Sequence, residues 1–306
     1  MTTPLATTSL TDGRSSKDRL RAVLADACAE VGLDARGAEL IRFVNNAVFR
    51  LARHPVVVRI VLTPGLRHRA DNVVNAARLL ADYSVPAVEL LPDVTQPLHV
   101  GIHSATFWQE VPDSGAEPTA AELATLLRQM HDIPVGDAEL PEWNPIDDLR
   151  RRISDAEGWD PDDVDFLLRR CDEVESRLAE VDYELPRGVV HGDAHLGNVI
   201  TTPGGTVLCD FDTTCVGPRE WDLVPIAVGQ LRFHHTVNKH EQLAEAYGFD
   251  VTRWDGFSVL REIRELKLTA AVLPIARSNP NIRSELRRRL RSVRAGDIFT
   301  RWVPYR

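Results

Sequence analysis

Two clusters of polar side chains interrupt short apolar runs in the second half of the chain. His191, Asp193 and Asn198 follow the run Gly-Val-Val, and Asp210 and Asp212 follow the run Val-Leu-Cys. Apolar runs of this length beside glycine and turn residues indicate buried strands, so we expect both clusters at strand ends. Carboxylates grouped there without partners would cost several kcal/mol. A bound divalent cation would remove that cost.

The spacing of these residues suits phosphoryl transfer. That reaction needs a carboxylate to accept the proton of the attacking hydroxyl, and oxygen ligands to hold Mg²⁺ against the phosphates. Asp193 fits the first role, and Asn198 and Asp210 fit the second, because Mg²⁺ takes one or two protein oxygens and completes its shell with phosphate and water. The interval from Asp193 to Asn198 and the Asp-Phe pair at 210 match the protein-kinase pattern H-R-D-x-x-x-x-N, then D-F-G. Gly192 and Asp212 depart from that pattern.

These two departures are typical of the aminoglycoside phosphotransferase family, whose members are related to choline kinases and protein kinases. The chain resembles this family over most of its length. The other segments that resemble the family are Phe43–Leu51 (nucleotide-loop hairpin), Val56–Ile60 (third strand), Val85–Val88 (link to the fourth strand), Thr106–Val111 (hinge) and Gly217–Leu223 (after the metal loop). The resemblance implies that Asp193 is the catalytic base and that Asn198 and Asp210 bind magnesium. It implies that His191, Asp212 and Asp222 support the site.

The resemblance also implies a nucleotide site, with ATP as the phosphate donor and GTP as the alternative. The residues expected there are Asn46, Arg59, Gln109, Glu110 and Val111. Arg59 stands where the family has a lysine. The chain has only three lysines, Lys17, Lys239 and Lys267. Arginine can bind phosphate bidentately, although it does not replace an ammonium group in every role. The alternative interpretation of Arg59 is an outward-pointing side chain on an edge strand.

The order of the apolar patterns predicts an α+β, bilobal, protein-kinase-like fold. We expect a disordered tail over residues 1–16, a small nucleotide-binding lobe with an antiparallel sheet over 17–111, and a larger, mostly helical catalytic and substrate-binding lobe over 112–306. The periodicities predict helices at 17–31, 68–82, 119–131, 162–178, 221–276 and 283–303, and strands at 46–51, 56–62, 88–91, 99–109, 188–190 and 207–209. Thr119 and Glu122 form a capping-box sequence.

Composition places the chain among cytoplasmic globular proteins. Its 306 residues are 43% hydrophobic and 26% charged, and no apolar run approaches the roughly 20 residues that span a bilayer. A net charge of −9 argues against a nucleic-acid partner. Four cysteines without a C-x-x-C pair indicate reduced thiols. We expect a monomer or a homodimer that contacts a nucleotide and a small hydroxyl-bearing substrate.

The sequence is compatible with two classes of acceptor. Residues 136–165 are strongly acidic, which is typical of a solvated surface but also of a wall that holds a polycation. The second interpretation favours an aminoglycoside or similar cationic antibiotic, and hence antibiotic resistance. The alternative is a metabolite such as choline or homoserine.

Two other function classes compete with a kinase. His191, Asp193 and His195 could belong to a metal hydrolase, which would retain stoichiometric zinc after dialysis, although the loop lacks the H-E-x-x-H spacing of a helical zinc site. A non-catalytic, nucleotide-binding regulatory protein is the second competitor, because the third-strand lysine is missing. Such a protein would bind nucleotide without acceptor-stimulated release of ADP.

Overall fold

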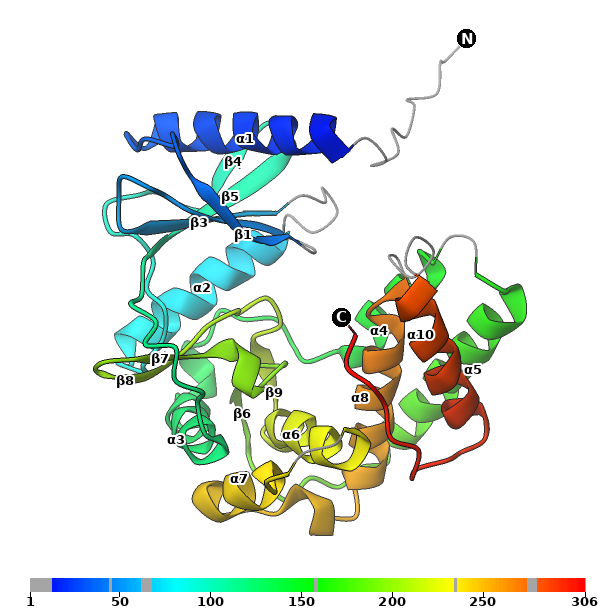
Figure 1. Cartoon of the computed structure of the whole chain (residues 1–306). Helices are drawn as coiled ribbons and strands as arrows, with labels where there is room; N and C mark the ends of the chain where they lie inside the picture. Colours follow the sequence, from blue (N-terminus) through cyan, green and yellow to red (C-terminus); the bar gives the residue numbers. More distant parts are fainter. Residues whose placement is uncertain are drawn as a thin grey trace. The chain divides into compact units, whose positions relative to one another are not determined.

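The structure is a computed structural model. It describes residues 13–43, 46–61, 68–156, 159–233, 236–273 and 280–305. The chain divides into two compact units, residues 1–82 with 87–112 and residues 83–86 with 113–306. The first unit is built on an antiparallel sheet and the second is mostly helical (Figure 1), which confirms the predicted α+β class.

A five-stranded antiparallel sheet forms the first unit. In spatial order its strands are β1 (Glu39–Phe43), β2 (Asn46–Arg50), β3 (Val56–Val61), β5 (His103–Gln109) and β4 (Leu98–Val100). The β-branched run that predicted β3 occupies the centre of the sheet, where β2 and β5 pair with it on either side. The interpretation of Arg59 as a residue on an edge strand is therefore wrong.

The two helices of the first unit, α1 (Gly13–Glu30) and α2 (His68–Asp82), lie on opposite sides of the sheet (Figure 1). Leu24 and Ala27 of α1 pack in one buried cluster with Phe49, Val58 and Phe107. Helix α1 begins at Gly13 instead of Lys17, so the last part of the predicted tail is helical. Residues 1–12 of that tail lie outside the described residues.

The sheet differs from the prediction in two places. The expected strand at 99–109 is broken at Gly101, whose positive φ of 58° makes the turn between β4 and β5. The expected strand at 88–91 forms only an isolated bridge between Leu90 and Trp108. Strand β1 was not predicted. Leu62 of the predicted strand at 56–62 lies outside the described residues. The same holds for Val44 and Asn45 of the segment that resembles the nucleotide-loop hairpin.

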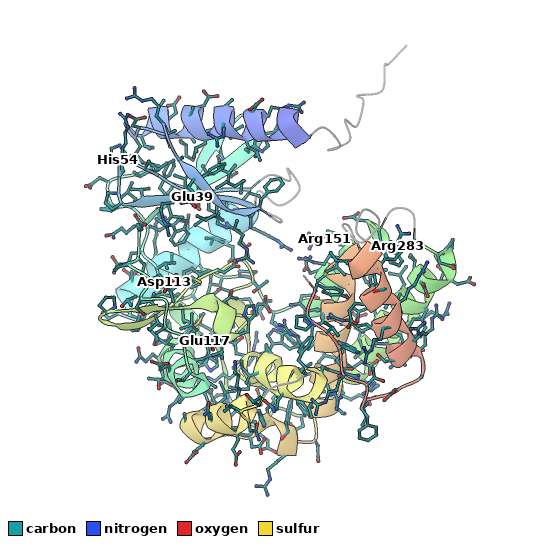
Figure 2. All side chains as sticks on the ribbon, in the orientation of Figure 1. Glu39, His54, Asp113, Glu117, Arg151 and Arg283 are labelled. Atoms are coloured by element: carbon teal, nitrogen blue, oxygen red, sulfur yellow. The ribbon has the colours of Figure 1, made fainter. Side chains whose placement is uncertain are left out.

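The main part of the second unit begins after Pro112, with a segment without helix or strand that contains Asp113 and Glu117 (Figure 2). Its helices are α3 (Ala120–His131), α4 (Pro145–Ser154), α5 (Pro161–Leu178), α6 (Glu220–Arg232), α7 (Lys239–Tyr247), α8 (Phe257–Ala270) and α10 (Pro280–Arg294). Two antiparallel pairs, β6 (Arg187–Val190) with β9 (Cys215–Pro218) and β7 (Val199–Thr202) with β8 (Gly205–Leu208), carry the polar loops.

Local sequence explains most helix boundaries in this unit. The capping box is confirmed, because the Thr119 hydroxyl accepts from the Glu122 amide and the Glu122 carboxylate accepts from the Thr119 amide. The acidic residues between 136 and 165 stabilise the N-termini of two helices. Asp160 caps α5, and aspartates occupy the first turns of α4 and α5. Helix α4 was not predicted. The predicted helix at 283–303 ends at Arg294, because Gly296 adopts a φ of 61°.

Two chemical expectations can be compared with the structure. All four cysteines are free thiols, as predicted. No helix within the described ranges is both long enough and apolar enough to cross a membrane.

Candidate active site

Asp222, in the first turn of α6, holds the backbone of the loop that follows β6. Its Oδ2 accepts from the His191 amide at 2.6 Å and its Oδ1 accepts from the Gly192 amide at 2.8 Å. His131 of α3 also donates from Nε2 to Oδ2, at 3.1 Å, and its Nδ1 lies 2.7 Å from the Tyr247 hydroxyl. The Asp222 side chain is fully buried, and these three groups are its hydrogen-bond donors among the described residues. Asp222 therefore shapes the loop and does not face a substrate.

Gly192 makes the sharp bend of this loop. Its φ is +81°, and a Cβ built on it would lie 2.1 Å from the Thr213 carbonyl oxygen. The Trp221 indole donates to the Gly192 carbonyl at 2.9 Å. No side chain fits at this position, which explains why the sequence departs from the protein-kinase pattern at Gly192.

The side chain of Asp193, the residue after the bend, is half exposed and pairs with a cation. Its Oδ1 accepts from the Arg264 NH1 group at 2.5 Å, and its Oδ2 lies 3.8 Å from the His195 Nε2. Burial opposes ionisation, but Arg264, Lys267 and His195 outweigh it and hold the pKa of Asp193 well below its usual range. Within the described part of the chain, Oδ2 accepts no hydrogen bond. One oxygen of an ionised carboxylate thus remains for a hydroxyl proton.

Asn198 and Asp210 lie on two loops that hydrogen bonds hold together. The Cys209 amide donates to the Asn198 carbonyl at 3.0 Å, and the Nε2 of His191 lies 3.0 Å from the Cys209 carbonyl. The Asn198 side chain donates from Nδ2 to the Asp193 carbonyl at 2.9 Å, which directs its own Oδ1 elsewhere. Asp210 adopts a φ of 68°, a left-handed conformation that non-glycine residues seldom adopt. His191 therefore has a structural contact, as expected of a supporting residue.

The donor set of these two loops fits Mg²⁺ better than zinc. An amide oxygen and a carboxylate are hard ligands, and Mg²⁺ needs only one or two of them when phosphates complete its shell. Among the described residues, no three or more His, Cys, Asp and Glu side chains form a group that could hold a metal. The His191 Nε2 is engaged with a backbone carbonyl. The structure gives no support to the hydrolase alternative.

Asp212 is half-buried beside these loops. The next residue, Thr213, donates from its hydroxyl to the His191 carbonyl at 3.1 Å. The Phe211 ring meets the His191 ring edge-on, with centroids 6.0 Å apart. This segment therefore stabilises the loop after β6.

In the first unit, Arg59 lies at the middle of β3 on the face opposite α1. It pairs in register with Val48 and Thr106, and its side chain is half-buried. Asn46 begins β2, opposite Val61. Asp71, in the first turn of α2, is exposed.

The segment at the end of β5 leaves two backbone groups without partners among the described residues. The amides of Gln109 and Glu110 donate to the carbonyls of Glu89 and Pro55, each at 2.9 Å. Because Pro55 has no N–H, it cannot donate a hydrogen bond to the Glu110 carbonyl, and the hydrogen bonding between β3 and β5 ends there. The Val111 amide likewise has no partner within the described part of the chain. This segment therefore has one carbonyl and one amide whose hydrogen bonds are not made by the described residues.

A family model of the phosphotransferase enzyme family matches residues 42–262, which is most of the chain. The chain belongs to this family. The match spans the third strand, the loops after β6 and β8, and the first part of α8, up to residue 262. It confirms the resemblance inferred from the sequence. No protein in a curated collection matches the sequence significantly.

Solved structures agree with this assignment at the level of the fold. The amicoumacin kinase hAmiN, in complex with AMP-PNP, Ca²⁺ and Ami, has a TM-score of 0.69 at 11% identity, covering 94% of this chain and 98% of its own. A choline/ethanolamine kinase family protein from Mesorhizobium loti has a TM-score of 0.59 at 21% identity, covering 91% and 94%. The GDP and kanamycin complex of APH(2")-IIia has a TM-score of 0.63 at 14% identity, covering 91% and 99%. At these identities the likeness shows a kinase-like fold.

Within this phosphotransferase fold, sequence reasoning missed two residues next to Asp193. Arg264 and Lys267 lie on α8, about 70 positions further along the chain, and both act on the Asp193 carboxylate. No motif spacing marks them. The only signal was the scarcity of lysine, which made Lys267 one of three candidates for any site that needs an ammonium group.

Proposed function

We propose that this phosphotransferase is a small-molecule kinase that transfers the γ-phosphate of ATP to a hydroxyl group. The observation that carries the proposal is Asp193, whose Oδ1 is paired with Arg264 and whose Oδ2 accepts no hydrogen bond among the described residues. It lies in a loop that Asp222 fixes and that is tied to the segment before Asp210. A regulatory protein without catalysis has no chemical need for that arrangement.

In the proposed reaction, the acceptor hydroxyl donates its hydrogen bond to Asp193 Oδ2. The hydroxyl oxygen forms a bond to the γ-phosphorus, and the bond from that phosphorus to the bridging oxygen of ADP breaks. The hydroxyl proton passes to Asp193 and then to solvent. Because Arg264 keeps the pKa of Asp193 low, Asp193 is a weak base that orients the hydroxyl and takes its proton late.

Asn198 and Asp210 would hold Mg²⁺ through the amide and carboxylate oxygens. Bound there, the ion would neutralise charge on the β- and γ-phosphates. For the nucleotide we propose Arg59 and Asn46 as phosphate-side contacts. The backbone at Gln109, Glu110 and Val111 would bind the base. The complexes of similar structures contain AMP-PNP or GDP, so GTP is a second donor to test.

Asp210→Asn should abolish the magnesium dependence of nucleotide binding. Replacing the carboxylate by an amide removes the charge that attracts the cation, and we expect at least about a tenfold loss of affinity for ATP with Mg²⁺. Titration calorimetry with Mg²⁺ and with EDTA measures this, and the metal-free affinity of the same variant is the control. An unchanged effect of Mg²⁺ would remove Asp210 from the metal site.

Arg59→Gln should raise the KM for ATP by about 10- to 100-fold, the range for losing a hydrogen bond to a charged group. Arg59→Lys should retain most of the affinity, because it restores the family's residue. Arg21→Gln on α1 removes the same charge from the opposite side of the sheet and should leave the KM within about twofold. Equal KM values for Arg59→Gln and Arg21→Gln would show that Arg59 does not contact the nucleotide.

Acceptor-stimulated release of ADP tests the proposed function as a whole. The panel should contain amine-rich antibiotics, choline-like alcohols, neutral polyols and hydroxy acids, each with ATP or GTP. We expect one chemical class to raise ADP release well above the basal rate. Nucleotide binding without stimulation by any class would favour the regulatory alternative.

A further inference from the structure

Helix α8 presents two cations to the Asp193 loop, one turn apart on the helix. Arg264 is 8% exposed and donates from NH1 to Asp193 Oδ1. Lys267 lies above the Trp221 ring, with Nζ 5.2 Å from its centroid. Its ammonium donates no hydrogen bond within the described residues. One carboxylate, Asp193, thus faces two positive groups.

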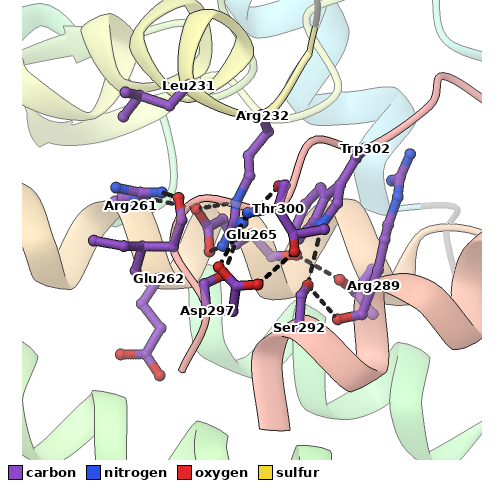
Figure 3. A network of polar contacts seen from close by, with 12 residues as sticks. Leu231, Arg232, Arg261, Glu262, Glu265, Arg289, Ser292, Asp297, Thr300 and Trp302 are labelled. Carbon is purple, nitrogen blue, oxygen red and sulfur yellow. Dashed lines mark hydrogen bonds and ion pairs between the residues drawn. The ribbon is translucent and has the colours of Figure 1, made fainter. Parts of the chain in front are cut away.

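Arg264 keeps one edge of its guanidinium unused. The buried Nε has no hydrogen-bond partner in the part of the chain that the structure describes. A carboxylate binds best to the edge formed by Nε and NH2, and Arg232 shows this in the same molecule. There the Nε and NH2 groups donate to the two oxygens of Glu265 at 2.7 and 2.5 Å (Figure 3). The corresponding edge of Arg264 lacks such an anion.

Neighbouring acids do not supply the missing anion. Asp148 of α4 acts electrostatically on Lys267, but its two oxygens are bound by Arg151 and Arg152 at 2.7 and 3.2 Å. Burial and the positive charge of Arg264 lower the pKa of Lys267, against the pull of Asp193. The unmatched positive charge is therefore costly in the free protein, and an oxyanion would offset it.

The position of α8 is fixed by a separate network. Glu265, next to Arg264 in the chain, binds both Arg232 of α6 and Arg261 (Figure 3). Arg232 also donates to the carbonyls of Asp297 and Thr300, each at 3.0 Å. Because these contacts hold the helix through Glu265, Arg264 and Lys267 do not depend on a ligand for their placement.

We propose that the acceptor of this kinase carries a carboxylate, which binds to the Nε edge of Arg264 and to the Lys267 ammonium while its hydroxyl donates to Asp193 Oδ2. The acceptor is then a hydroxy acid. This inference rests on the proposed function, and it replaces the expectation of a polycationic acceptor. The alternative ligand for this edge of Arg264 is the phosphoryl group during its transfer, which also carries negatively charged oxygens.

The kinetic test compares hydroxy acids with their primary amides as acceptors. We expect the acids to have the higher kcat/KM in the wild-type protein. Because both cations also act on Asp193, either substitution can slow every acceptor, so the readout is the difference between acids and amides. Arg264→Gln and Lys267→Gln should each lower kcat/KM by about 10- to 100-fold more for the acids than for the amides. Arg288→Gln removes a charge from the exposed face of α10 and should change neither value by more than about twofold. Equal losses for acids and amides would show that no acceptor carboxylate binds this edge and would overturn the proposal.

Binding without nucleotide provides the second measurement. Calorimetric titration with the same hydroxy acids should show binding to the wild type and to Arg288→Gln, and about tenfold weaker binding to Arg264→Gln and Lys267→Gln. If no hydroxy acid binds the wild type, the carboxylate proposal fails even where another acceptor stimulates ADP release. If acids bind but no acceptor of any class is phosphorylated, the proposed function fails instead.

Discussion

Asp193→Asn should lower acceptor phosphorylation by about 10²- to 10⁴-fold, the usual contribution of a positioned general base. Asparagine keeps the shape of the side chain, but its amide cannot accept the hydroxyl proton. The hydrogen bond from Asn198 to the backbone carbonyl at residue 193 stays in place, so the loop retains its anchor. Nucleotide affinity should therefore remain within about threefold. Initial rates with saturating ATP and calorimetry of ATP binding measure the two quantities.

The exposed Asp255 provides a matched control for this variant. Asp255→Asn changes the net charge by the same amount and should leave the rate unchanged. A wild-type rate in Asp193→Asn would exclude Asp193 as the proton acceptor. A parallel loss in both variants would point to overall charge as the cause.

Asp222→Ala should lower the free energy of unfolding by about 3–5 kcal/mol, as expected when one partner of a buried charged group is removed. The change leaves the amides of His191 and Gly192 and the Nε2 of His131 without their acceptor in a fully buried place. Activity should fall with stability, because the loop that carries Asp193 loses its anchor. Urea unfolding followed by tryptophan fluorescence measures the change.

Two further variants sharpen this prediction. Asp222→Asn keeps one acceptor oxygen and should be less destabilising than Asp222→Ala. Asp132→Ala removes an exposed carboxylate, 3.6 Å from Arg219, and should cost less than about 1 kcal/mol. If Asp222→Ala and Asp132→Ala had the same urea midpoint, the buried contacts of Asp222 would contribute nothing to stability.

The sequence predicted the loops of the site well because their chemistry is local. The two strands that end in polar residues and the fixed interval from Asp193 to Asn198 all lie within 25 residues. The role of Gly192 needed the structure, since only the approach of the Thr213 carbonyl shows why a side chain cannot fit.

Contacts between distant segments could not be predicted in the same way. Arg264 meets Asp193 across 71 positions, and Asp222 meets His131 across 91. Neither pair has a sequence signal, because packing of α8, α6 and α3 decides which side chains meet. The place of β3 in the sheet was also undetermined, since a β-branched run predicts a strand without giving its neighbours. The alternative interpretation, with Arg59 on an edge strand, is wrong for that reason.

Phosphorylation of an acceptor is tested by ³¹P NMR of a reaction with ATP, Mg²⁺ and the acceptor panel. We expect a new phosphate-ester signal that grows in step with ADP, with the acceptor oxygen as the site of the new bond. The signal should be absent with Asp193→Asn. If ADP appeared only with inorganic phosphate, or if no ADP formed with any acceptor, the assignment as a small-molecule kinase would be contradicted.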